Sequence, residues 1–153
     1  MDDLEQIRQL KYRYLRTLDT KQWDEFADCL VPEATADYAG LTFADRAELV
    51  DYLRTNLVPT LVTMHHCHHP EITLDDTLDD DTAGPATARG RWYLHDQVIS
   101  EELRFRLEGA AFYDDRYVRT PEGWRISHTG YQRTFEATYQ LAEPPGFRLK
   151  IAE

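Results

Sequence analysis

The sequence predicts an α+β domain in which three N-terminal helices pack on one strongly curved, mostly antiparallel mixed sheet. Apolar residues recur at helical spacing before Pro59, whereas the chain after it is rich in the β-branched and aromatic residues that favour strands. Helices first and strands afterwards are typical of α+β domains. A curved sheet closed by helices forms a cone with a hollow centre, and such pockets are common sites for small molecules.

Three segments before Pro59 have helical periodicity. Pro32 ends the second of them, which is short, and Pro59 stops the third. Asp45, followed three residues later by Glu48, resembles a capping box that opens the third helix. The apolar residues of the three helices are, in order, Leu4, Ile7, Leu10, Tyr14 and Leu18; Trp23, Phe26, Ala27 and Leu30; and Leu49, Val50, Leu53 and Leu57.

The chain after Pro59 predicts long antiparallel strands joined by turns. An acidic loop, Asp75–Pro85, and a turn at Thr120–Gly123 separate some of them. Neither a repeat nor a linker is visible, so we expect one domain over residues 1–140 and an irregular tail, 141–153. The predicted strands, with a short one before the third helix, are Ala34–Tyr38, Thr60–His69, Glu71–Leu74, Ala86–Ser100, Leu103–Val118 and Trp124–Phe135.

The charge of the chain excludes several classes of partner. Its 28 acidic and 17 basic residues give a net charge of −11 without a basic cluster, so we expect neither nucleic acid nor an anionic membrane as a partner. No apolar run approaches the ~20 residues that span a bilayer. The acidic N-terminus lacks an apolar signal region, and we therefore expect a cytoplasmic protein.

The sequence contains no motif for a cofactor or a redox centre. The glycine-rich fingerprints of nucleotide sites and the serine nucleophile elbow are missing. Cys29 and Cys67 are far apart and form no CxxC pair, so a disulfide framework is not expected. Any chemistry must therefore come from side chains alone, and we expect no cofactor.

A run of four histidines and one cysteine, His65–His69, is the sharpest local feature. Such a run could suggest a metal site. On a strand, however, His65, Cys67 and His69 would face one way, and His66 and His68 the other. Because the run is divided between two faces, we expect no metal there and instead one pocket histidine, the natural general base near neutral pH.

Two residues of the first helix are candidates with alternative roles. Asp19, at its end, either caps the second helix or orients a histidine, as carboxylates do in catalytic triads. Tyr14, on the apolar stripe, is either a core residue or a donor to a substrate carbonyl. The residues alone leave the two roles of Asp19 about even, whereas an aromatic residue on such a stripe is more often core than catalytic.

Two later segments supply further candidates. Alternation sends His95 and Asp96 to opposite faces, so only one of them can enter the pocket. Arg133 shares a face with Tyr131 and is either a surface residue or an inward residue that needs a carboxylate, for which Asp96 is a candidate.

From about Ile7 to Tyr139 the pattern resembles the SnoaL-like branch of the nuclear transport factor 2 superfamily. Within it the sequence is similar to the bile acid 7α-dehydratases and, more distantly, to the scytalone dehydratases. The stretches that carry the resemblance are Leu10-Lys11 through Tyr14-Leu15-Arg16, Leu18-Asp19-Thr20-Lys21, Trp23-Asp24-Glu25, Met64-His65, His69-Pro70-Glu71-Ile72-Thr73, Gly90-Arg91-Trp92-Tyr93-Leu94, Gly109-Ala110-Ala111-Phe112-Tyr113 and Gly130-Tyr131-Gln132-Arg133.

The resemblance implies a cone-shaped fold and a set of catalytic residues. Those of the bile acid 7α-dehydratases fall on residues of matching type, namely Tyr14, Asp19, His65, Asp96 and Arg133. The scytalone dehydratases match at Asp19, Tyr38 and His65 and would place His95 in the site, but Leu18, Ala111 and Tyr113 depart from them and argue against a scytalone-like substrate. We prefer Asp96 to His95. The aromatic residues expected to contact the substrate are Tyr38, Trp92, Tyr113 and Tyr131.

We therefore expect a cofactor-independent dehydratase that removes water from a hydroxylated, carbonyl-bearing ring substrate, steroid-like or polycyclic. A ketosteroid isomerase- or polyketide cyclase-like enzyme and a non-catalytic ligand-binding or assembly domain remain open. Leu103–Val118 has more apolar positions than one cavity can shield, which predicts a homo-oligomer. The resemblance favours a trimer, and a dimer is possible.

Overall fold

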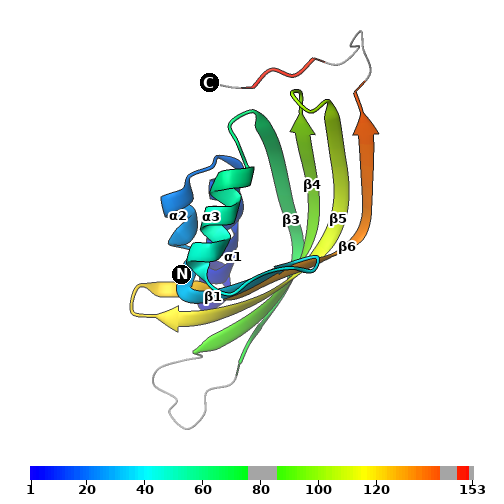
Figure 1. Ribbon diagram of the computed structural model, residues 1–153. Coiled ribbons are helices and arrows are strands. Elements are labelled where there is room, and N and C mark those ends of the chain that lie inside the picture. The colour runs from blue at the N-terminus through cyan, green and yellow to red at the C-terminus, as the bar shows by residue number, and fades with distance from the viewer. Residues whose placement is uncertain (76–85, 142–147, 152–153) are drawn as a thin grey trace.

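Three helices pack inside the curve of one six-stranded sheet in the computed structural model, which describes residues 1–75, 86–141 and 148–151. Helices come first and the long strands follow, as predicted, and the α+β class is thereby confirmed. The sheet bends so sharply that it borders the helices on two sides (Figure 1). The elements are α1 (Asp3–Asp19), α2 (Trp23–Ala27), β1 (Leu30–Tyr38), β2 (Leu41–Phe43), α3 (Arg46–Asn56), β3 (Leu61–Leu74), β4 (Thr87–Ser100), β5 (Phe105–Thr120) and β6 (Gly123–Gln140).

The strands follow the order β2-β1-β6-β5-β4-β3. All neighbouring pairs are antiparallel except β1 and β6, which run parallel, so the sheet is mixed as expected. The sheet is not closed, since β2 and β3 lie at its two edges. The helices close the concave side instead, which leaves space for a cavity between the two layers.

Both longer helices begin at an aspartate cap, of which the one at Asp45 was predicted. Asp45 precedes α3, and its carboxylate accepts a hydrogen bond from the Glu48 backbone N–H at 2.9 Å. Asp2 caps α1 in the same way through the N–H of Glu5, at 2.8 Å. Such caps satisfy N–H groups that have no partner within the helix.

Several predicted boundaries are wrong. The second helix ends at Ala27, and Leu30 begins β1, where it pairs with Ile126. Pro32 lies inside β1, within a stretch where the register with β6 shifts, so its missing N–H removes no regular ladder bond. The short strand β2 was not predicted; it follows a turn in which Gly40 has a φ of +97°, a conformation that glycine adopts without strain.

The two strands predicted on either side of Pro70 are one strand, β3. The register shifts between His68 and Glu71, and His69 has a positive φ of 48°. This bulge lies on an edge strand, where a proline is tolerated because only one side needs ladder hydrogen bonds. The bulge also breaks the side-chain alternation, which matters for the histidine run.

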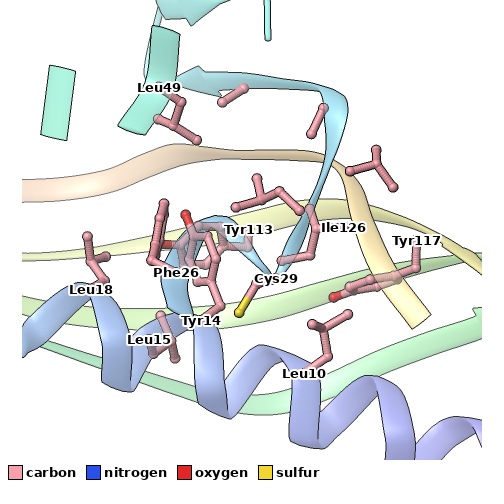
Figure 2. Close-up of a cluster of buried hydrophobic side chains, with 14 of the residues drawn as sticks. Leu10, Tyr14, Leu15, Leu18, Phe26, Cys29, Leu49, Tyr113, Tyr117 and Ile126 are labelled. Atoms are coloured by element: carbon pink, nitrogen blue, oxygen red, sulfur yellow. The ribbon is translucent and has the colours of Figure 1, made fainter. Parts of the chain in front are cut away.

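The core lies between α1 and the sheet (Figure 2). The inner face of α1 contributes Ile7, Leu10, Tyr14, Leu15 and Leu18, all buried. All of them except Leu15 belong to the predicted stripe, and its remaining member, Leu4, is half-buried. Burial of this stripe against β5 and β6 fixes the rotation of α1 and hence the direction of Asp19, its last residue.

The predicted acidic loop beyond Asp75, and 142–147 and 152–153 of the predicted tail, lie outside the described residues. Leu141 and residues 148–151 belong to no helix or strand. In the part of the chain that the structure describes, no helix is both long and apolar enough to cross a membrane.

Candidate active site

A cavity of about 200 Å³ lies between α3 and the sheet. One wall is apolar, with leucines from α1 and α3, and the other carries polar and aromatic side chains from the strands. A small apolar space with a few convergent polar groups is the usual form of a ligand site. The cavity is lined by Leu18, Tyr38, Leu41, Tyr52, Leu53, Leu57, Thr63, His65, Asp96, Val98, Tyr113, Tyr131 and Arg133.

Asp19 and His65 form a hydrogen-bonded pair at the wall of this cavity. The Asp19 carboxylate lies 2.6 Å from His65 Nδ1 and accepts a second hydrogen bond, at 2.8 Å, from the His65 backbone N–H. The hydroxyl of Thr63 donates to the same carboxylate at 2.9 Å. An Nδ1–H held by a carboxylate leaves Nε2 as the unprotonated nitrogen, which is the arrangement of a general base.

The two alternatives for Asp19 are thereby separated. Gln22 occupies the cap position of α2, with no side-chain capping bond in that described segment, whereas Asp19 bonds across to β3. Asp19 itself borders a surface groove between α1 and β3, and His65 lines both the groove and the cavity. Asp19 therefore orients His65 from outside the cavity.

Tyr14 was expected to be either a core residue or a hydrogen-bond donor in the pocket, and it is a core residue that contacts the pocket through Tyr38. Tyr14 is fully buried, is not among the cavity-lining residues, and shares a short hydrogen bond with the hydroxyl of Tyr38. Tyr38 does line the cavity, and its ring stacks on that of Tyr131 at 5.1 Å between centroids. Burial raises the pKa of both Tyr14 and Tyr38 above the ordinary value, so both hydroxyls are protonated at neutral pH. Tyr38, and not Tyr14, therefore borders the cavity.

Asp96 and Arg133 form a two-pronged ion pair on the same strand wall as His65, whose cross-strand partner on β4 is Asp96. Arg133 Nη2 donates to Asp96 Oδ2 at 2.9 Å, and Nη1 donates to Oδ1. Hydrogen bonding to Asp96 raises the pKa of Arg133. Gly109 makes room for the guanidinium, because a Cβ at that position would lie 2.6 Å from Arg133 Nη1.

His95 faces away from the cavity, as the preference for Asp96 requires. Its Nε2 lies 3.1 Å from Glu108 Oε1, and its ring lies 6.5 Å from that of His66 on the outer face. His95 and Asp96 face opposite ways, as strand alternation predicts. Burial of Asp96, which is 2% exposed, identifies which of them is inside.

Comparison with known proteins identifies the family of the chain. The family model of the SnoaL-like domain matches residues 1–130, which is most of the chain. The chain belongs to the SnoaL-like family.

Relatives and solved structures are similar over most of this SnoaL-like chain. An uncharacterised protein of Mycobacterium tuberculosis strain H37Rv is 27% identical over 128 residues, 82% of each chain. A presumed scytalone dehydratase from Novosphingobium aromaticivorans has a TM-score of 0.74 at 19% identity, covering 96% of this chain and 95% of its own. A hexachlorocyclohexane dehydrochlorinase from Novosphingobium barchaimii has a TM-score of 0.72 at 15% identity, covering 94% and 92%. At such identities the structural matches establish the fold alone.

The SnoaL-like domain also contains a buried polar network that the sequence analysis missed. Lys11 Nζ lies 2.7 Å from Asp115 Oδ2, and both side chains are 0% exposed. Asp115 accepts further hydrogen bonds from Tyr117 at 2.9 Å and Thr129 at 2.7 Å. The signal was present in the spacing: Lys11 follows Ile7 by four residues on the buried stripe, and Asp115 stands between two inward tyrosines of β5.

Trp92, expected to contact the substrate, is part of this network instead. Its indole N–H donates to the Tyr117 hydroxyl at 2.9 Å, and Trp92 is not among the residues lining the cavity. Gly90 leaves room for the pair, since a Cβ there would meet the Tyr117 ring at 3.0 Å. The other three predicted contact residues, Tyr38, Tyr113 and Tyr131, do line the cavity.

The histidine run divides between two faces as predicted, with one exception. His65 is directed inward, while His66 and His68 are exposed. His69 does not share the face of His65, because the bulge interrupts the alternation before it, and it is exposed. Within residues 1–75, 86–141 and 148–151, no three His, Cys, Asp or Glu side chains are placed to hold a metal ion.

Both cysteines should be unreactive in the folded protein. Burial raises the pKa of the Cys67 thiol to about 12 and also raises that of the Cys29 thiol, so both are mainly in the unreactive thiol form at pH 8. We expect a chromogenic disulfide reagent at pH 8 to modify neither residue in buffer within minutes, and both in denaturing urea. Cys29→Ser and Cys67→Ser assign each signal, and rapid modification of the half-buried Cys67 in buffer would contradict the raised pKa of its thiol.

Proposed function

We propose that this SnoaL-like domain is a cofactor-independent lyase that removes water from a neutral, hydroxylated ring compound bearing a carbonyl. The observation that carries the proposal is the Asp19–His65 pair, whose imidazole lines the same cavity as the side chain of Tyr38. A base and an oxygen-binding donor on one cavity are the groups that proton abstraction next to a carbonyl requires.

The proposed reaction assigns one step to each of these groups. His65 Nε2 takes the proton from the carbon next to the substrate carbonyl, and the electron pair moves onto the carbonyl oxygen, to which Tyr38 donates. The carbonyl then reforms, a carbon–carbon double bond appears, and the bond to the hydroxyl oxygen breaks. The protonated His65 gives its proton to that oxygen, which leaves as water. Asp19 holds the imidazole in place and stabilises its cation between the two steps.

The charges in the site favour a neutral substrate. Arg133, the cation that lines the cavity, is paired with Asp96 and lies 3.5 Å from Glu136 through its Nε. A carboxylate or phosphate would therefore meet no unpaired cation among the lining residues and would have to be desolvated close to Asp96. The Asp96–Arg133 pair is instead suited to position a hydroxyl or carbonyl of the substrate.

The volume of the cavity limits how much of a substrate it can enclose. Its volume of about 200 Å³ is below the roughly 300–1,000 Å³ of sites for drug-sized ligands. We infer that it encloses the reacting ring, while the remainder of a steroid-like or polycyclic substrate extends past Leu41 and Leu57, which also line it.

The test is a screen of neutral β-hydroxy ketones with one to four rings. The purified protein should convert at least one compound into a product lighter by the mass of one water, and the His65→Ala variant should not. A product of unchanged mass with a shifted double bond or a new ring would instead identify an isomerase or cyclase, which uses the same base. Tight binding with recovery of unchanged ligand would identify a carrier and overturn the proposal.

A homo-oligomer, with a trimer favoured, is the second part of the proposal. Large aromatic side chains, among them Tyr93, Phe112 and Phe135, are at least partly exposed on the strands, and the rings of the first two lie 4.6 Å apart. Exposed apolar surface of this kind favours association. Light scattering at micromolar concentration should give about three times the chain mass of 17.9 kDa, and a value equal to one chain would rule out a stable assembly.

A further inference from the structure

The buried Lys11–Asp115 ion pair has no part in the proton transfers described above, and its burial is complete on both sides. Removing two charges from water costs more than a hydrophobic pair of similar size would, so such pairs are weak evidence for a purely stabilising role. The surroundings of the two charged groups indicate a different one.

The ammonium group lies against two tyrosine rings that belong to the site. Lys11 Nζ is 3.4 Å from the centre of the Tyr113 ring and 4.6 Å from that of Tyr14. Tyr113 lines the cavity, and Tyr14 shares its hydroxyl hydrogen bond with Tyr38, which also lines it. The positive charge is therefore separated from the cavity by one side chain, that of Tyr113.

The carboxylate is tied to residues that do not reach the cavity. Asp115 accepts from Tyr117 and Thr129, and neither of these lines the cavity. In Figure 2, Tyr14 and Tyr113 lie close together, whereas Tyr117 lies further along β5. The pair is thus a fixed dipole whose positive end is against the tyrosines of the site.

A fixed positive charge in a dry environment favours negative charge on a nearby oxygen, and it needs no reorganisation as that charge develops. In the proposed reaction, that charge appears on the substrate carbonyl oxygen when the C–H proton leaves. The hydrogen bond between the Tyr14 and Tyr38 hydroxyls carries the electrostatic effect of the Lys11 charge to Tyr38, which lines the cavity.

We propose that Lys11, held in place by Asp115, is a positioning residue that makes the Tyr14–Tyr38 hydroxyl pair selective for an oxyanion over a neutral oxygen. The proposal rests on the proposed function and adds a ligand class to the site: planar phenolates and enolates. A phenolate resembles the enolate intermediate and binds without turnover, so the proposal is testable before the substrate is known.

The experiment compares 4-nitrophenol with its neutral isostere 4-nitroanisole. Absorbance titration reports the ionisation of bound 4-nitrophenol, and calorimetry gives both affinities. The wild-type protein should bind 4-nitrophenol as the phenolate, with a pKa lower than that of the free phenol. In Lys11→Met/Asp115→Asn the phenolate affinity should fall on the order of tenfold, while the affinity for 4-nitroanisole stays within about twofold.

A matched control removes an ion pair on the surface, so that the net charge of the protein stays unchanged, as it does in the buried variant. Arg89→Met/Asp75→Asn breaks a pair of which the arginine side chain is 63% exposed, and it should leave both affinities unchanged. If the buried variant fails to fold, Lys11→Gln/Asp115→Asn replaces it, because two neutral amides can still hydrogen-bond. Circular dichroism and melting curves verify that the variant compared is folded.

Several outcomes would overturn the inference. The inference is wrong if the wild-type protein does not prefer the phenolate to 4-nitroanisole, or if it binds neither probe. It is also wrong if the folded Lys11→Met/Asp115→Asn variant keeps the preference. Failure of the proposed lyase activity is separate, since it is measured by loss of water from hydroxy ketones and not by phenol binding. If the wild-type protein dehydrates no compound but prefers phenolate, and the Lys11→Met/Asp115→Asn variant loses that preference, the result would support this inference and not the proposed lyase activity.

Discussion

Replacing His65 by alanine is expected to lower turnover by about 10²–10⁴-fold, the usual contribution of a positioned general base. The imidazole is the proton acceptor that faces the cavity, and Asp19 contacts it at 2.6 Å. Asp19→Asn should lose much of the same factor, because the Nδ1–H would no longer meet a carboxylate. The assay is dehydration of the compound found in the screen, followed by mass spectrometry.

The double change should cost little more than either single change, since residues that act as one unit are not additive. His66→Ala is the matched control: it removes an imidazole from the neighbouring position of β3, on the exposed side. The His66→Ala variant should stay close to wild type. If His66→Ala abolishes turnover and His65→Ala does not, the assignment of the base is wrong.

Lys11→Met is expected to cause the largest loss of stability, about 3–5 kcal/mol in the free energy of unfolding. Methionine nearly fills the volume of lysine, but the Asp115 carboxylate is then buried without its cation. Urea denaturation monitored by tryptophan fluorescence measures the change.

Two variants test the cause of that loss. Lys11→Met/Asp115→Asn should recover most of it, because no unpaired charge remains. Arg89→Met, which breaks an exposed pair with Asp75, should change the free energy of unfolding little. Equal losses in Lys11→Met and in the double variant would mean that packing, and not the unpaired charge, sets the cost.

Local patterns were sufficient for most of the fold. The stripe of α1 from Ile7 onward, the Asp45 cap of α3 and the long strands were all predicted, because each depends on a period or on a contact within a few residues. The misplaced boundaries share one cause. The strand β1 begins at Leu30 only because Ile126, almost a hundred residues later, offers it a partner, and no local propensity reports such a pairing.

The site shows the same division. Strand alternation by itself established that His65 and His66 face opposite ways, and that His95 and Asp96 do too. Which member of each pair is inside depended on how β3 and β4 pack under the helices, since a period of two gives relative and not absolute directions. For His69 even the relative direction was predicted wrongly, because a bulge interrupts the alternation of β3 before it.

The sequence by itself determined the fold class, the absence of a nucleotide or redox motif, and the residue types that a family resemblance placed in a site. Only the tertiary structure placed Tyr38 in front of Tyr14, moved Trp92 into a core network, and joined Lys11 to Asp115. These facts concern side chains brought together from elements far apart in the chain. Their contacts are decided by how α1 is rotated over a bent sheet, and that rotation is set by the packing of the whole buried face.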